Sequence, residues 1–154
     1  MESAFQFTNP ALSGLEFWIN KKFNSEKDTK IQIRMNMSVK VAKEENRNEA
    51  LVELDVEIGE KNADIPFYIK AIEGANFRWN DELDDNMIER LLNQNAPSLL
   101  LSYLRPIVAQ VTSASKYGTY NIPFVNFIPF LSIPCLVIII ATFLKAVSNK
   151  YFSV

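Results

Sequence analysis

The chain has 154 residues, of which 48% are hydrophobic, and a formal net charge of −2. This length and composition are sufficient for one domain with a hydrophobic core. A net charge so close to zero provides no general attraction to nucleic acid, so we expect no nucleic-acid partner. The chain contains no His, the most common general base at neutral pH, and no residue spacing suggests a reactive site. We therefore expect no enzymatic activity, no cofactor and no metal.

The cysteine content and the N-terminal residues point to one cellular compartment. Cys135 is the single Cys, so no disulfide can form within the chain, which is consistent with a reducing compartment. Residues 1–20 lack the basic start and the continuous apolar core of a signal peptide. We expect the protein to be cytoplasmic.

The charges are distributed unevenly along the chain. All 18 acidic residues lie at or before Glu89, together with 11 basic residues, which gives this part a net charge of 11 − 18 = −7. The remaining residues carry five basic side chains and no acidic ones. One interpretation is an exposed acidic sheet followed by a more apolar helical part, and the other is an acidic surface that docks a basic partner.

Alternating side chains predict four strands. Apolar and polar residues alternate strictly over residues 30–42, as in a strand with one covered face and one wet face. The same period recurs over 52–58, and we expect further strands at 15–19 and 65–72. Short polar connections favour antiparallel pairing in chain order, a meander closed by Gly74.

Two helices are expected after the strands. Asn80, Asp81 and Glu82 are suited to capping a helix over 82–93, because carboxylates favour the positive end of the helix dipole. The acidic residues there lack the Gly and the distal Glu of a calcium loop, so we interpret them as capping residues. Pro97 is expected to begin a second helix that ends by residue 115, with a bend caused by Pro106.

Residues 117–130 are rich in aromatic side chains and prolines and show neither helical nor strand periodicity. Such a segment is expected to lie on an apolar surface. It either lines the core of its own domain or forms one wall of a groove for apolar ligands.

Three segments in order, residues 65–77, 97–105 (PSLLLSYLR) and 120–127 (YNIPFVNF), together match a known pattern. They resemble segments of the SecB family of protein-export chaperones: residues 97–105 resemble the helix of that family that begins with proline, and residues 120–127 resemble the loop that follows it. Residues 65–77 resemble the fourth strand and the turn after it, including Gly74. The order and spacing of the three segments agree, and the resemblance extends over about residues 5–127.

The resemblance implies an α+β fold in which a four-stranded antiparallel sheet packs with two helices, assembled as a homotetramer of two dimers. It also implies an ATP-independent chaperone that binds unfolded preproteins in an apolar groove and passes them to the export ATPase of the translocase. The implied client-binding residues lie on the second strand and on the aromatic loop: Ile31, Ile33, Met35, Tyr117, Tyr120, Ile122, Phe124 and Phe127. Ile69 and Ala71 correspond to positions that the family buries between subunits. Ordinary core packing is the alternative for the three strand residues.

The chain departs from the family pattern at two places. Lys70 stands at a position of the acidic surface through which the family contacts its ATPase. A SecB-like chaperone for another client, such as an antitoxin, is therefore the alternative function. After a SecB-like domain of residues 1–127, the segment 128–154 is atypical, since it has no charge from 128 to 144. Three interpretations of this segment are open: a membrane anchor, a buried or self-associating helix, or an aberrant reading of the gene. A membrane anchor would make this a membrane-associated protein.

Overall fold

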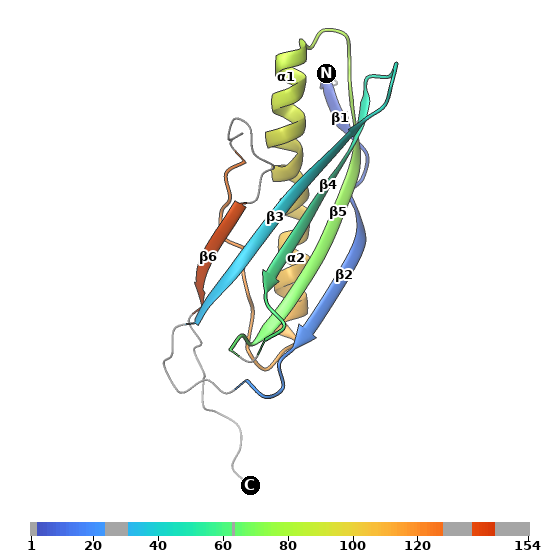
Figure 1. Ribbon diagram of the computed structural model, residues 1–154. Helices are drawn as coiled ribbons and strands as arrows, with labels where there is room; N and C mark the ends of the chain where they lie inside the picture. Colours follow the sequence, from blue (N-terminus) through green and yellow to red (C-terminus); the bar gives the residue numbers. More distant parts are fainter. Residues whose placement is uncertain (1–2, 24–30, 63, 128–136, 144–154) are drawn as a thin grey trace.

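The computed structural model describes residues 3–23, 31–62, 64–127 and 137–143, the last of these for the backbone only. Within these residues, six strands form one antiparallel sheet that is backed on one side by a helical run, an α+β fold (Figure 1). The strands are β1 (Phe5–Phe7), β2 (Ala11–Ile19), β3 (Ile31–Lys43), β4 (Glu49–Gly59), β5 (Phe67–Trp79) and β6 (Val137–Phe143). The expected α+β class with an antiparallel sheet is confirmed.

Strands β3 and β4 follow the alternation that predicted them. In β3 the apolar residues from Ile31 to Met37 are buried, and the polar residues between them lie on the other side of the sheet. In β4 the residues from Ala50 to Ile58 are buried in the same alternating manner. The two strands pair antiparallel, for example Met37 with Val56, so their buried side chains share one side. We call this the inner side of the sheet, and the opposite one the outer side.

The expected order of the strands is wrong. Strands β3, β4 and β5 are consecutive neighbours, but β2 pairs with β5 and not with β3. Alternation identifies a strand and its buried face, but it does not identify the neighbouring strand. The ring of Phe17 in β2 packs against that of Phe67 in β5, with ring centroids 6.3 Å apart, and this contact belongs to the observed order.

The first edge strand is interrupted. Both β1 and β2 pair with β5, Phe7 opposite Phe77 and Ala11 opposite Gly74. Pro10 lies between the two strands, and proline has no N–H to donate to a ladder. The two strands therefore act as one discontinuous edge, and β1 and the C-terminal β6, which pairs with β3, are the two strands beyond the four that were expected.

Strand β5 is longer than predicted, because it continues through Gly74 to Trp79. Gly74 does not close the sheet, but pairs with Glu53 of β4 on one side and Ala11 of β2 on the other. A Cβ at this position would lie 3.4 Å from the side chain of Glu53, so the glycine allows close packing on the outer side.

The two expected helices form one continuous helical run. It consists of α1 (Asp85–Arg90), the π-helical segment η1 (Leu91–Asn95) and α2 (Ala96–Ser113). The run begins later than predicted, because Asp84 is the cap and its carboxylate accepts a hydrogen bond of 2.9 Å from the Met87 N–H. Pro97, the second residue of α2, cannot donate a helical hydrogen bond, and the π segment that ends at Asn95 widens the turn where that donor is missing. Helix α2 continues through Pro106.

The helical run covers the inner side of the sheet (Figure 1). Helix α2 packs against β4 and β5. Its fully buried side chains include Leu100, Leu104 and Val108, which lie in the same hydrophobic cluster as the inner residues of the strands. Each such side chain contributes about 1.5–3 kcal/mol when it leaves water.

The buried or self-associating helix, one of the three interpretations of the C-terminal segment, does not form over residues 137–143. This segment is strand β6, which pairs antiparallel with β3 and therefore belongs to the same sheet. Val and Ile, which make up four of its seven residues, favour strands when a sheet edge is available to pair with them. Among the described residues, no helix has both the length and the apolar composition to cross a bilayer. The rest of segment 128–154 lies outside the described residues.

Candidate functional site

The strand residues assigned to the floor of the groove lie on the inner side of β3. Ile33 and Met35 have no exposed surface, and Ile31 is 9% exposed. They belong to the same hydrophobic cluster as Tyr120 and Ile122 of the loop that follows α2. The predicted floor and part of the predicted wall therefore belong to one hydrophobic core.

The loop of residues 117–127 is fixed at its start by Tyr117. The hydroxyl of this residue donates a hydrogen bond of 2.5 Å to the carbonyl oxygen of Asn20, just after β2. Its ring meets that of Phe23 edge to face, with centroids 5.6 Å apart. The Asn20 side-chain amide donates in turn to the carbonyl oxygens of Asn62 and Ile65. One tyrosine thus joins the loop to the end of β2 and to the connection before β5.

A second attachment lies at Tyr120. Its backbone N–H donates a hydrogen bond of 2.9 Å to Oγ1 of Thr112, a buried residue in the last turn of α2. The Tyr120 ring packs edge to face on Phe67, with centroids 5.7 Å apart. Burial raises the pKa of Tyr120 to about 12, so its phenol is neutral at physiological pH.

The third attachment holds the loop beside the middle of α2. The Arg105 guanidinium donates a hydrogen bond of 3.2 Å to the carbonyl oxygen of Pro123. The next residue, Phe124, points away from the core and is 87% exposed, whereas Val125 and Phe127 return to it. The loop therefore presents one aromatic side chain to solvent from a backbone that is fixed on both sides of it.

Of the eight residues predicted to bind clients, only Phe124 is exposed in the isolated chain. The others are buried at 0–9% exposure: Ile31, Ile33, Met35, Tyr117, Tyr120, Ile122 and Phe127. Ile69 and Ala71, predicted at a subunit interface, are fully buried on the inner side of β5. Two small hollows in the described part lie at the ends of the sheet, and no residue of this loop lines either of them.

Sequence reasoning missed an exposed apolar edge. Phe7, Leu12 and Leu15 lie along β1 and β2 and are 40–44% exposed. Leu15 lies in the strand predicted over residues 15–19, but alternation alone does not show that this strand is at the sheet edge. The signal that was available is Pro10, which favours an edge position.

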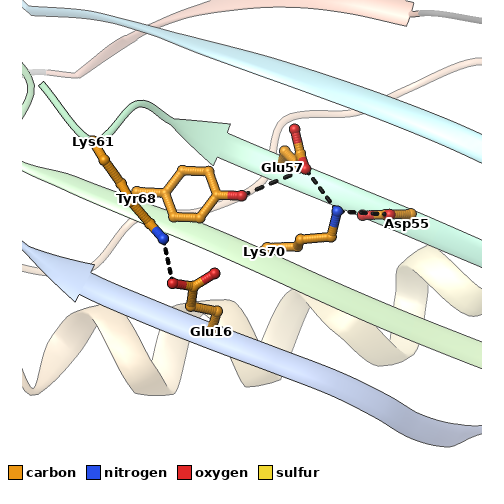
Figure 2. Close-up of polar contacts among 6 residues, drawn as sticks. All are labelled: Glu16, Asp55, Glu57, Lys61, Tyr68 and Lys70. Carbon is orange, nitrogen blue, oxygen red and sulfur yellow. Dashed lines mark hydrogen bonds and ion pairs between the residues drawn. The ribbon is translucent and has the colours of Figure 1, made fainter.

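The outer side of the sheet carries interleaved opposite charges (Figure 2). The Lys70 ammonium lies 2.8 Å from a Glu57 carboxylate oxygen and 3.2 Å from one of Asp55. Hydrogen bonds to Glu57 and then Asp55 raise the pKa of Lys70 above its usual value. Lys61 pairs with Glu16 on the neighbouring strand β2. The acidic residues that the sequence places here are thus partly neutralised by lysines of the same surface.

Tyr68 completes this polar group. Its hydroxyl donates to Glu57 over 3.4 Å, and its ring lies under the Lys61 ammonium, 4.9 Å from it. Desolvation and the Glu57 charge raise the pKa of Tyr68. Figure 2 shows Lys70 between two carboxylates of β4, so its positive charge offsets part of the negative charge of this surface.

One carboxyl group lies on the inner side. Glu73 of β5 is 2% exposed and faces the same side as Ala71 and Ala75. It pairs with Leu54 on β4 and Leu12 on β2. Within the described residues its Oε2 accepts no hydrogen bond. Desolvation raises the pKa of Glu73, because burial disfavours the charged form.

Comparison with known proteins identifies one family. A family model described as "Preprotein translocase subunit SecB" matches residues 16–131. Among solved structures, the fold is similar to a SecB-like chaperone of Mycobacterium tuberculosis in complex with a ChAD peptide from the HigA1 antitoxin. That match has a TM-score of 0.64 and 10% sequence identity, and it covers 79% of this chain and 91% of the other. Identity this low establishes the fold alone.

A weaker structural match is a protein of unknown function from Streptococcus agalactiae. Its TM-score is 0.41 at 11% identity, with 78% of this chain and 97% of the other covered. No curated protein matches the sequence.

Proposed function

This chain belongs to the SecB family, and from that premise we propose that it is an ATP-independent molecular chaperone that binds unfolded preproteins and supports their export. A chaperone that meets preproteins before translocation works in the cytoplasm, so the proposal includes a cytoplasmic location. Binding requires no nucleotide, because apolar segments of an unfolded chain associate with an apolar surface by leaving water.

The observation that carries this proposal is the loop of residues 117–127. Three attachments, at Tyr117, Tyr120 and Pro123, hold it on the sheet and on α2. Between the last of these and the buried Val125, Phe124 is presented to solvent. A pre-positioned aromatic side chain supplies contact area at small conformational cost and does not require a particular client sequence.

We further propose that the buried members of the site become accessible when the loop moves away from the sheet. Residues 118–127 have no regular secondary structure. The Tyr120 N–H donates to Oγ1 of Thr112, and the Arg105 guanidinium donates to the carbonyl oxygen of Pro123. Segments with few backbone hydrogen bonds open locally at lower free energy than strands or helices. Opening would expose Ile31, Ile33 and Met35 beside the loop aromatics, which together form the apolar groove that was predicted.

Assembly as a homotetramer belongs to the same proposal. In the edge strand β2, Phe17 pairs with Ile69 of β5, and Leu15 pairs with Ala71. Ile69 and Ala71 would therefore contribute to a subunit interface indirectly, by holding β2 in place at the edge of the sheet. Leu15 is 44% exposed, which leaves apolar surface for a second copy to cover. Several sites on one oligomer would increase the avidity for a long client by 10²–10⁴-fold, on the order found for multivalent binding.

The test uses a fluorescently labelled, cysteine-free protein that is diluted from urea and aggregates when alone. A stoichiometric excess of the full chain should suppress its light scattering in the absence of ATP, and fluorescence anisotropy should report a complex. Bovine serum albumin at equal mass serves as the control for crowding. If the client aggregates equally with the chain and with the control, the proposal is wrong. Multi-angle light scattering of the chain alone should give four times the mass of one chain, and a monomer at all concentrations would contradict the assembly.

The charge pattern around Lys70 favours a second candidate, a SecB-like chaperone dedicated to an antitoxin or another client that is not exported. A basic residue paired with Asp55 and Glu57 reduces the acidity of the surface that the family uses for its ATPase. The relative from Mycobacterium tuberculosis was solved with an antitoxin peptide. Isothermal titration of the chain with a purified export ATPase distinguishes the two: suppression of client aggregation without any ATPase binding favours the dedicated chaperone.

A further inference from the structure

The edge of strand β3 is occupied by the chain's own β6. Figure 1 shows β6 beside β3. Seven residues of each strand pair antiparallel, from Ile31 opposite Phe143 to Met37 opposite Val137. On its other side β3 pairs with β4, so without β6 it would be the edge of the sheet. A free edge presents unpaired N–H and C=O groups, which accept an added strand from another polypeptide.

The covered stretch is the one that carries the proposed floor of the groove. Ile31, Ile33 and Met35 lie opposite Phe143, Ala141 and Ile139. An extended client segment that added to the sheet beside this floor would need the same backbone donors and acceptors of β3. Strand β6 and such a client therefore exclude each other at this edge.

Strand β6 also has the composition of a client segment. Its sequence, VIIIATF, contains no charge and no proline, and Thr142 is its one polar residue. Short segments with high β propensity and without charge are those by which unfolded chains aggregate. The chain thus carries, after its aromatic loop, a strand of the kind that a chaperone of unfolded polypeptide would bind.

We propose that β6 occupies the edge of β3 at residues 31–37, where a client would otherwise bind, and that an extended apolar segment of an unfolded client displaces β6 from this edge. This inference rests on the proposed function and adds the regulation of the same site. The exchange replaces one set of strand hydrogen bonds by another, so it requires no external energy source. Because β6 belongs to the same chain, its effective concentration at this edge is on the order of millimolar, and it lowers the apparent affinity for every client.

A reversible cross-link tests the displacement in the full chain. In a Cys135→Ser background, Arg34→Cys and Ile140→Cys place two cysteines directly opposite each other on β3 and β6. The matched control pairs Ile140→Cys with Ser38→Cys, which lies four residues further along β3 and is too distant for a disulfide without movement of the backbone. The probe is the labelled, cysteine-free client described above, so oxidation and reduction affect only the chaperone.

Oxidation of the Arg34→Cys/Ile140→Cys variant should weaken client binding by about tenfold or more, and reduction should restore it. The control should bind equally in both states. Equal binding by the locked and reduced forms would overturn the inference while leaving the proposed function intact. If neither form binds the client, and the unmodified chain does not bind it either, the proposed function fails. Disulfides found only between chains would show that β6 comes from a second copy, which also overturns the inference.

Releasing β6 from β3, instead of locking it there, provides an independent test. The double substitution Ile138→Pro/Ile139→Pro removes two consecutive N–H groups, and consecutive N–H groups of a strand point to opposite sides. One of the two therefore points toward β3, and its loss should release β6 and tighten client binding several-fold. Unchanged or weaker binding by this variant, with an unchanged circular dichroism spectrum over the helical bands, would contradict the inference.

Discussion

The two sides of the sheet differ in burial and in charge, although the same strands form both. On the inner side, residues such as Ile33 and Val56 lie beneath the helical run and the aromatic loop, without exposed surface. On the outer side, Lys70 and Glu57 occupy positions between those buried residues and form partly exposed ion pairs. The inner side therefore determines whether the chain folds, and the outer side determines which charges a partner would meet.

This difference indicates which mutations should affect stability and which should affect binding alone. Removing a buried apolar side chain leaves a cavity and destabilises the fold, whereas changing an exposed ion pair alters a surface at little cost in stability. Phe124 is the exception on the inner side, since it is exposed and yet belongs to the loop that covers the core.

The largest effect is expected from Leu104→Ala in α2. This side chain is fully buried, and its truncation should reduce the free energy of unfolding by about 2–5 kcal/mol, measured by urea denaturation. Tyr103→Ala, at the adjacent and 42% exposed position, is the control and should cost much less. Equal losses for both variants would mean that the helix does not face the sheet as described.

Phe124→Asp should separate binding from stability. It should weaken client binding by roughly tenfold or more, because burial of a Phe side chain is worth about 1.5–3 kcal/mol, while the urea midpoint should change little. Asn126→Asp, which adds the same charge at an exposed position of the same loop, should bind normally. Tyr120→Asp should instead unfold the chain, because Tyr120 is buried. Normal client binding by Phe124→Asp would remove this residue from the site.

Glu73→Gln should stabilise the protein at neutral pH by about 1 kcal/mol, since it removes a buried carboxylate that lacks a full set of partners. The folded pKa of Glu73 is raised above the unfolded value, so its carboxylate opposes folding above the folded pKa and this penalty disappears as protonation occurs. The advantage of the variant should therefore shrink as the pH falls through that pKa. Urea denaturation at a series of pH values measures it, with Glu53→Gln on the outer side as the control. A constant advantage at all pH values would contradict this account.

The smallest effect is expected from Lys70→Gln on the outer side. The ion pairs of Lys70 are partly exposed, so their loss should cost less than about 1 kcal/mol, and added salt should reduce the difference. Because the folded pKa of Lys70 is raised, its contribution is complete below the unfolded value of 10.5 and is lost as the pH rises through the folded pKa. The same variant leaves Asp55 and Glu57 without their lysine, and should strengthen binding of a basic partner in a titration. A loss of several kcal/mol, insensitive to salt, would mean that the pairs are buried.

Much of the sheet and part of the site could be predicted from residue patterns. The alternation in β3 and β4 reports which side chains are buried, since a strand exposes successive side chains to opposite sides. The family was predicted from three segments in order. The burial of Tyr117 and Tyr120 could not be predicted, because an aromatic segment without periodicity has the same composition whether it lines a groove or closes a core.

The sequence by itself determined which residues are apolar, in what period they recur and to which family they belong, because these properties depend only on neighbours along the chain. Only the tertiary structure decided that β2 lies beside β5, that the helices join into one run and that β6 occupies the edge of β3. Strand pairing is a contact between residues far apart in the chain, and several pairings satisfy the same alternation. The observed pairing is the one that lets one helical run and one loop bury the inner side of the sheet.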